Sequence, residues 1–432
     1  RRRCRSVGRG VMAGAHSPAP RGRYPLDAVR AVAAVGILLF HAYQNNRFTG
    51  TDTYPWTGLP HELMLSSDAV VDLFFVISGF VLWLPVARDG LEGRTQRPGR
   101  VLVLRRAVRL VPLYLVVVLV VWLVSNPQMS TAYWNDLLLH LTFTQVYSDQ
   151  YIFWTVGPAW TLAVEFHFYL LIAVTVPLLA WWARRAITHR ARLAGVLTLP
   201  VLMTAAGVAW LTWAIHLSPQ PGDAWAVWFG PLAKAPIFAM GMFLAVLVAA
   251  GLKVNQRRHR ITLSSAAVAL ILGGTLLRSS LPGQTSQWLA LAFGLAAAAF
   301  VATIVMNDGP PMRWLNWKPL VRLGILSYSI YLLHEPVMRL ARYTGLLPEP
   351  GSTWGIPATF AVVLILTVAL AMVTYPVIEQ YGLKLLDMLG PDGRRKSYYD
   401  HPIEEARPSR RPSMHIAWVP DGELLKPATR RG

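Results

Sequence analysis

The sequence predicts an all-α membrane protein: a polytopic helical bundle of about ten transmembrane helices with both termini in the cytoplasm. Of its 432 residues, 54% are hydrophobic and only 15% are charged, a balance that exceeds what the surface of a soluble protein tolerates. The apolar residues form runs long enough to cross a bilayer core. The formal charge of +19 comes from basic residues between these runs, which the positive-inside rule explains without a nucleic-acid partner.

Ten apolar segments of spanning length follow one another along the chain. They cover residues 24–43, 69–87, 101–124, 158–182, 195–215, 224–250, 261–278, 285–306, 320–343 and 354–379. Lys and Arg concentrate at the N-terminus, in alternate loops and after Glu379, whereas the odd-numbered loops contain one basic residue, Arg47. An even number of spans with both termini inside satisfies this distribution and places the odd-numbered loops outside.

Both ends of the chain lack the periodicity of a folded element. Residues 1–23 are rich in Arg, Gly, Pro and Ser and predict a disordered basic tail. Residues 383–432 mix Arg, Pro and acidic residues and predict a largely disordered cytoplasmic tail. A membrane domain over 24–382 lies between them. The single cysteine, Cys4, excludes an internal disulfide and a cysteine-based zinc site.

Two ionisable side chains, Arg30 and His41, lie within the first apolar segment. A cation at the bilayer centre costs roughly 2.5–3.5 kcal/mol on insertion scales, and such residues usually face a bundle interior or a watery cavity and mark a site. The eleven-residue step between them corresponds to about 16 Å of helix, or half a bilayer core. These two residues therefore indicate a path across the membrane.

The polar residues of the other segments fall on two levels under this topology. His41 ends the first span near the outside, and His334 lies about 21 Å along the outward-running ninth span. Glu165 lies about seven residues into the inward-running fourth span, and Asp72 lies near the outer start of the second, so all four side chains can meet at one level. The cytoplasmic level carries the basic residues Arg30, Arg105, Arg106 and Arg109.

Six ordered motifs carry a more specific signal. Besides Arg30-x10-His41 they are VDLFFVISGFVL at 71–82, RRAVRLVPLY at 105–114, WTLAVEFHFYLL at 160–171, LSYSIYLLHEP at 326–336 and YPVIEQYG at 375–382. Together they resemble the acyltransferase 3 family of integral membrane O-acyltransferases over residues 24–382. The resemblance implies transfer of an acyl group, often acetyl, from cytoplasmic acyl-CoA to a hydroxyl of a glycan, a lipid-linked sugar or a secondary metabolite. Two departures from the family pattern, Glu165-Phe166-His167 and Glu335, bear on the acceptor preference.

The outer-level residues suit the chemistry that this resemblance implies. Acyl transfer to an alcohol needs a base near the hydroxyl, and an imidazole that titrates near pH 7 suits that task. His41 is the predicted general base. Glu165 or Asp72 is expected to orient its imidazole or stabilise its cation, and His334 completes the predicted catalytic set.

The basic residues at the cytoplasmic level suit the binding of the acyl donor. Arg105, Arg106 and Arg109 are predicted to bind the phosphates of coenzyme A, while the pantetheine arm enters the bundle toward His41. Arg30 then meets a phosphate or the thioester carbonyl. Acyl-CoA, with acetyl-CoA as the expected form, is a substrate in this interpretation, and neither a tightly bound cofactor nor a metal is expected.

Several of these residues have a structural alternative. The arginines are also explained as positive-inside, snorkelling residues, and His334 as a hydrogen-bonded packing histidine. Ser78 can act as a nucleophile, but Ser and Gly in membrane helices more often allow close packing. Lys234 is either a buried ion-pair partner or a residue that lines a cavity.

Two other functions fit part of the pattern. A secondary transporter also has many spans with charged residues at several depths, although no two-fold repeat supports it here. A non-catalytic lipid or glycan binder does not need arginines opposite a histidine site. Within the enzyme interpretation, a cell-envelope sugar and a macrolide hydroxyl are both compatible acceptors. The predicted location is the bacterial cytoplasmic membrane, with membrane lipids as further partners.

Overall fold

The computed structural model describes residues 25–94, 99–125, 130–186, 188–309, 312–382 and 384. The secondary structure within these ranges is helical and includes no β-strand, which confirms the predicted all-α class. The predicted tails, 1–23 and 383–432, lie outside the described residues except for Lys384.

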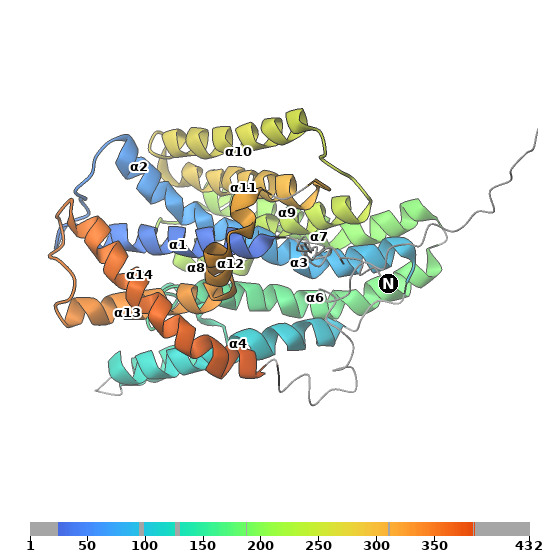
Figure 1. Cartoon of the computed structure of the whole chain (residues 1–432). Helices are drawn as coiled ribbons and strands as arrows, with labels where there is room; N and C mark the ends of the chain where they lie inside the picture. Colours follow the sequence, from blue (N-terminus) through green and yellow to red (C-terminus); the bar gives the residue numbers. More distant parts are fainter. Residues whose placement is uncertain are drawn as a thin grey trace, which may run out of the picture. The chain divides into compact units, whose positions relative to one another are not determined.

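The described residues form a series of long helices joined by short helical turns (Figure 1). The α-helices are α1 (Leu26–Asn45), α2 (Leu59–Ser66), α3 (Val70–Glu92), α4 (Gly99–Ser125), α5 (Thr131–Leu141), α6 (Ala159–Arg185), α7 (His189–Thr212), α8 (Trp225–Phe229), α9 (Pro231–Ala249), α10 (Arg257–Arg278), α11 (Leu289–Val305), α12 (Lys318–Ile325), α13 (Ser327–Tyr343) and α14 (Gly355–Thr374). The 3₁₀ and π segments are η1 (Ser67–Ala69), η2 (Gln145–Tyr147), η3 (Trp213–Leu217), η4 (Gly283–Trp288), η5 (Arg313–Asn316) and η6 (Tyr375–Glu379).

Nine stretches of the described residues are long and apolar enough to cross a membrane, and each overlaps one of the ten predicted segments. The second stretch joins α2, η1 and α3, and the last continues α14 through η6 to Gly382. The chain is therefore a multi-pass membrane protein, as predicted.

The remaining predicted segment, 320–343, is not one continuous helix. It divides at Leu326 into α12 and α13, and Figure 1 shows α12 turned across the direction of α13. The 17 residues of α13 make a helix of about 25 Å, shorter than a typical span. Three charged residues on α13, Glu335, Arg339 and Arg342, explain why it is less apolar than the other spans.

α13 nevertheless crosses the bundle beside α1. Three residues before its start, Gly324 of α12 lies so close to α1 that a Cβ added there would be 1.8 Å from the backbone oxygen of Asp27. Near its end, the Arg342 Nε donates a hydrogen bond to the Oδ1 of Asn45, the last residue of α1, at 3.2 Å. The two helices therefore run in the same direction from one end to the other, and α13 takes the place of the predicted ninth span.

Side-chain contacts near the helix ends divide the loops into two groups, one at each end of the bundle, as the predicted alternation of loops requires. At one end of α10, Arg278 forms a bidentate ion pair with Asp68, with both N–O distances 2.8 Å. At the other end of α10, Lys253 Nζ lies 2.8 Å from Asp308 Oδ1. Hydrogen bonds from Lys253 and Asn255 lower the pKa of the Asp308 carboxyl. The first pair joins the outer end of a predicted span to a loop predicted outside, and the second joins two loops predicted inside; the orientation itself remains a prediction from charge.

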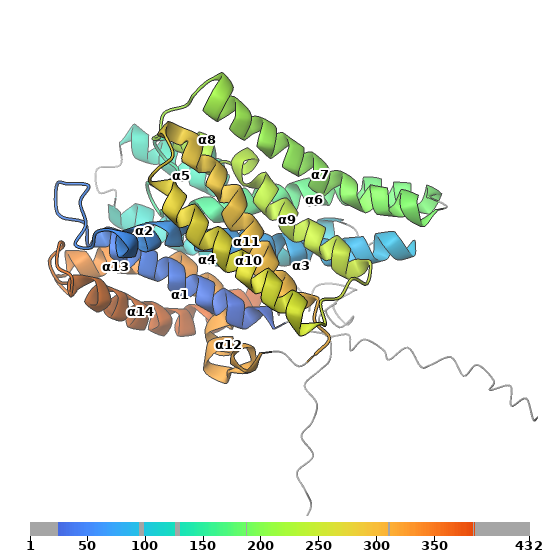
Figure 2. The same cartoon turned by 90° about the horizontal axis from the view of Figure 1, so that it is seen from above.

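α3 lies at the centre of the bundle and contacts α1, α6, α7, α9 and α11 (Figure 2). Its closest neighbour is α9, because each helix has a glycine where the other helix's backbone passes. A Cβ added to Gly79 would be 2.2 Å from the backbone oxygen of Phe238, and one added to Gly241 would be 2.0 Å from that of Val76. Small residues allow such approach between membrane helices, where lipid removes most of the hydrophobic drive for association.

We expect Gly241→Ala to destabilise the bundle by about 1–3 kcal/mol, because a methyl group has no room at the α3–α9 crossing. Gly273→Ala is the matched control, since a Cβ there meets nothing within 4 Å and alanine favours a helix by up to about 1 kcal/mol. Thermal unfolding of the two variants in one detergent measures the difference. Equal melting temperatures would show that the crossing tolerates a side chain.

Candidate active site

Arg30 and His41 lie on one face of α1, because eleven residues are close to three turns of helix. The Arg30 guanidinium pairs with Asp27 across an N–O distance of 3.5 Å and exposes 19% of its side-chain surface. His41 is half-buried near the other end of the helix. α1 thus sets a cation and an imidazole about 16 Å apart along one line.

The two predicted histidines are in contact. The ring centroids of His41 and His334 lie 5.0 Å apart. His334 Nδ1 lies 2.6 Å from the carbonyl oxygen of Tyr331, and a carbonyl can only accept, so this nitrogen carries the proton. His41 Nδ1 likewise donates to Gln44 Oε1 at 3.0 Å. In a neutral imidazole the proton-accepting lone pair is then on Nε2, and the buried Nε2 of His334 has no hydrogen-bond partner among the described residues.

Glu165 belongs to a different hydrogen-bonded group, between α3 and α6. Its Oε1 accepts a hydrogen bond from Ser78 Oγ at 2.8 Å, and its Oε2 accepts one from the Tyr169 hydroxyl. All three side chains are buried. Arg30 and Arg106 lie near enough to act electrostatically on the Glu165 carboxylate, so Glu165 faces the arginines.

Asp72 is buried and lies in the electrostatic range of Lys234 and of the Asp68–Arg278 pair. Asp68, which the sequence reasoning did not select, is the carboxylate whose charge acts on His41. No hydrogen bond among the described residues links Asp72 or Glu165 to an imidazole. The four side chains expected at one level therefore divide into a histidine pair and two separate carboxylates. Asp68 lies one helical turn before Asp72, and this spacing was the signal by which the sequence could have identified Asp68.

The three arginines of α4 have three different environments. Arg109 Nε lies 3.9 Å from Oε2 of Glu379 in η6, and Glu379 is fully buried and accepts a hydrogen bond from Ser329. The Arg106 guanidinium lies 5.9 Å from the ring centroid of Tyr169. Arg105 is half-buried, and no ion pair links it to another described residue. Of these three arginines, therefore, only Arg106 contacts a residue that is hydrogen-bonded to Glu165.

A narrow crevice between α4, α6 and α13 begins at Arg106. Apart from this guanidinium and three tyrosines, its walls are apolar; they consist of Arg106, Ala107, Leu110, Val111, Tyr114, Phe143, Leu162, Phe166, Tyr169 and Tyr328. Its volume is about 10 Å³, room for about one water molecule.

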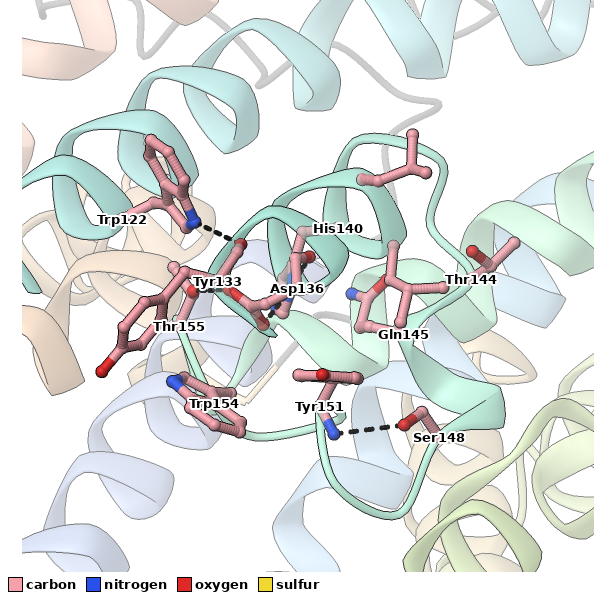
Figure 3. A network of polar contacts seen from close by, with 12 residues as sticks. Trp122, Tyr133, Asp136, His140, Thr144, Gln145, Ser148, Tyr151, Trp154 and Thr155 are labelled. Carbon is pink, nitrogen blue, oxygen red and sulfur yellow. Dashed lines mark hydrogen bonds and ion pairs between the residues drawn. The ribbon is translucent and has the colours of Figure 1, made fainter. Parts of the chain in front are cut away.

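A buried network in the α5 region supports this site from one end (Figure 3). His140 Nδ1 lies 3.1 Å from Asp136 Oδ1, and Thr155 donates a hydrogen bond to Oδ2 of the same carboxylate. The next residues lead into α6, and Arg339 of α13 donates to the carbonyl oxygens of Trp154 and Thr155. The network thereby fixes the start of the helix that carries Glu165 and ties it to the helix that carries His334. The sequence reasoning missed Asp136 and His140, although their i, i+4 spacing indicates a helical pair.

The fold and the site define a class: a multi-pass membrane protein with two ring-paired histidines on α1 and α13 and a buried carboxylate, Glu165, within electrostatic range of Arg30 and Arg106. A family model described as an acyltransferase domain matches residues 23–376. The chain therefore belongs to the acyltransferase 3 family and is a membrane acyltransferase, which confirms the resemblance seen in the motifs.

Individual relatives cover most of the chain at low identity. BcsY of Komagataeibacter xylinus is 27% identical over 375 residues, which cover 84% of this chain and 83% of BcsY. The acyltransferase MdmB of Streptomyces mycarofaciens is 26% identical over 336 residues, 73% of this chain and 78% of MdmB. The O-acetyltransferase OatA of Staphylococcus aureus is 24% identical over 341 residues; these cover 74% of this chain but only 51% of OatA. No solved structure is significantly similar to the chain.

Arg109→Ala is expected to lower the free energy of unfolding by about 1–3 kcal/mol, because it leaves the buried Glu379 carboxylate without its cation. Glu379→Gln in the same chain should recover part of this loss, since it removes the unpaired charge. Arg105→Ala is the matched control, and thermal unfolding in one detergent compares the three. Equal losses in Arg105→Ala and Arg109→Ala would mean that the Arg109–Glu379 pair contributes nothing.

Proposed function

We propose that this protein transfers an acyl group, acetyl in the simplest case, from cytoplasmic acyl-CoA to a hydroxyl of a glycan, a lipid-linked sugar or a secondary metabolite. The observation that carries the proposal is the His41–His334 pair, in which hydrogen bonds at Nδ1 direct the lone pairs to Nε2. OatA is an O-acetyltransferase and MdmB an acyltransferase by name, which supports the same reaction class.

His41 is the proposed general base. Its Nε2 removes the proton of the acceptor hydroxyl as the oxygen attacks the thioester carbon. The new C–O bond forms, the C–S bond breaks, and the proton passes from the imidazolium to the departing thiolate of coenzyme A. His334 positions His41 through their ring contact, and the nearby charge of Asp68 stabilises the transient imidazolium.

The donor is proposed to enter from the arginine side. Arg106, with Arg105 beside it, holds a phosphate of acyl-CoA, and the pantetheine arm enters the bundle from there toward His41. Arg30 lies on the face of α1 that leads toward His41, where it can contact a phosphate or the thioester carbonyl. Arg109 acts in this scheme by holding Glu379. Acyl-CoA is a substrate in this scheme, and the acceptor approaches from the opposite side of the membrane. The lipids of the bacterial cytoplasmic membrane surround the bundle.

His41→Ala is expected to reduce acyl transfer by about 10²–10⁴-fold, the usual cost of losing a general base. The assay incubates purified protein with radiolabelled acetyl-CoA and a hydroxyl acceptor and measures labelled product. His216→Ala, which removes an exposed imidazole in a predicted outer loop, should keep wild-type activity. Near wild-type transfer by a folded His41→Ala protein would remove His41 from the mechanism, and substrate flux without transfer would support a carrier.

Arg106→Ala should raise the KM for acyl-CoA by about tenfold or more, because a charge-assisted phosphate bond contributes roughly 1.5–3 kcal/mol. Arg106→Lys should recover only part of the affinity, since lysine keeps the charge but lacks the planar fork. The exposed Arg190 on α7 provides the control variant Arg190→Ala. An unchanged donor KM in Arg106→Ala would leave Arg106 as a topology signal alone.

A further inference from the structure

We propose that the acceptor binds in a polar concavity formed by residues 44–52, at the end of α1 next to His41, and that Gln44 joins this site to the base. The inference rests on the proposed role of His41 and adds to it a location and a ligand class. The ligand it predicts is an uncharged group with several hydroxyls, such as a sugar ring.

The concavity is large enough for such a ligand and adjoins the reacting imidazole. Its volume is about 520 Å³, and it is open to solvent, because seven of its eight lining residues are exposed. The lining residues are Gln44, Asn45, Arg47, Phe48, Thr49, Gly50, Thr51 and Asp52. Gln44 Oε1 accepts the 3.0 Å hydrogen bond from His41 Nδ1. One wall of the concavity is therefore the side chain that orients the proposed base.

The base of this loop is anchored on both neighbouring helices. Asn46 is fully buried, and its Nδ2 donates to the carbonyl oxygen of Ala42 at 2.8 Å and to Thr359 Oγ1 on α14 at 3.1 Å. Its own carbonyl oxygen accepts from the backbone nitrogen of Gly351 at 3.0 Å. On the other side, Arg342 of α13 donates to Asn45. The concavity is therefore built on the helices that carry His41 and His334.

The chemistry of the lining favours a neutral, hydroxyl-rich ligand. Arg47 Nη1 lies 3.0 Å from Asp52 Oδ1, so the two charges cancel and neither an anion nor a cation is selected. The remaining polar groups are amides and threonine hydroxyls, which both donate to and accept from alcohols. The Phe48 ring offers one apolar surface of the kind on which the face of a sugar ring rests.

Arg47 also has no other explanation in the sequence. It is the single basic residue of the predicted outer loops, so the positive-inside rule, which accounts for the other loop cations, does not account for it. Its partner Asp52 lies in the same loop, so the two residues together add no net charge to the concavity.

Binding of methyl hexopyranosides to the full chain in lipid nanodiscs tests the site directly, by saturation-transfer NMR without any donor. We expect saturable binding that weakens at least about fivefold in Arg47→Ala and in Asp52→Ala. Lys253→Ala, which breaks an exposed ion pair at the opposite end of the bundle, should bind like wild type. Absence of saturable binding to wild type, or binding that both loop variants retain, would overturn the proposal.

Acyl-transfer kinetics test the link through Gln44. Gln44→Ala should lower kcat about tenfold with the donor KM unchanged, and Gln44→Glu should restore it, because a carboxylate also accepts from Nδ1. A Gln44→Ala enzyme with unchanged kcat would overturn the link.

The two proposals fail in different ways. His41→Ala should abolish transfer but keep glycoside binding. If wild type binds glycosides through Arg47 but transfers nothing, the acyl-transfer function is wrong and the site stands. If wild type transfers and the loop variants bind normally, the site is wrong and the function stands.

Discussion

The parallel contact between α1 and α13 is the interaction on which the rest of the site depends. α1 carries His41 and α13 carries His334, and their rings meet only while the two helices keep one register. The close approach of α1 to Gly324 of α12, just before α13, and the bond from Arg342 to Asn45 hold that register at both ends. Because lipid offers no hydrogen-bond partners, the polar groups of both helices must be satisfied inside the bundle.

The sequence motifs gain a physical meaning from their contacts, because motifs far apart in the chain meet in pairs. Glu165, in the motif at 160–171, accepts a hydrogen bond from Ser78, in the motif at 71–82. Glu379, in the last motif, accepts one from Ser329 and pairs with Arg109. Each meeting buries a carboxylate and gives it donors from other helices. The motifs therefore describe two polar contacts that hold the bundle together as much as they describe a reaction.

The sequence predicted well how deep each polar residue lies along its span, but it predicted poorly which direction that residue faces around the helix. Nine apolar segments were found correctly because the bilayer dictates their length and composition. Counting residues along each span also placed His41 and His334 at one level, where the structure joins them. The same counting predicted that Glu165 meets them, but the hydrogen bonds of its carboxylate go to Ser78 and Tyr169, because depth says nothing about which way a helix face points once the bundle is assembled. Gln44 was missed for a related reason: its importance comes from a bond to His41 rather than from its own position.

The glycine contact between α3 and α9 also limits how this protein can move. Where the backbone of one helix touches the other directly, as at Gly79 and Gly241, a slide of one residue would place a side chain in a space that holds none. The two helices therefore behave as one rigid unit at the centre of the bundle. An alternating-access carrier moves one half of its fold against the other, and this core would have to travel whole with one half. A bundle with such a core suits an enzyme that keeps its helices in place better than a carrier that rearranges them.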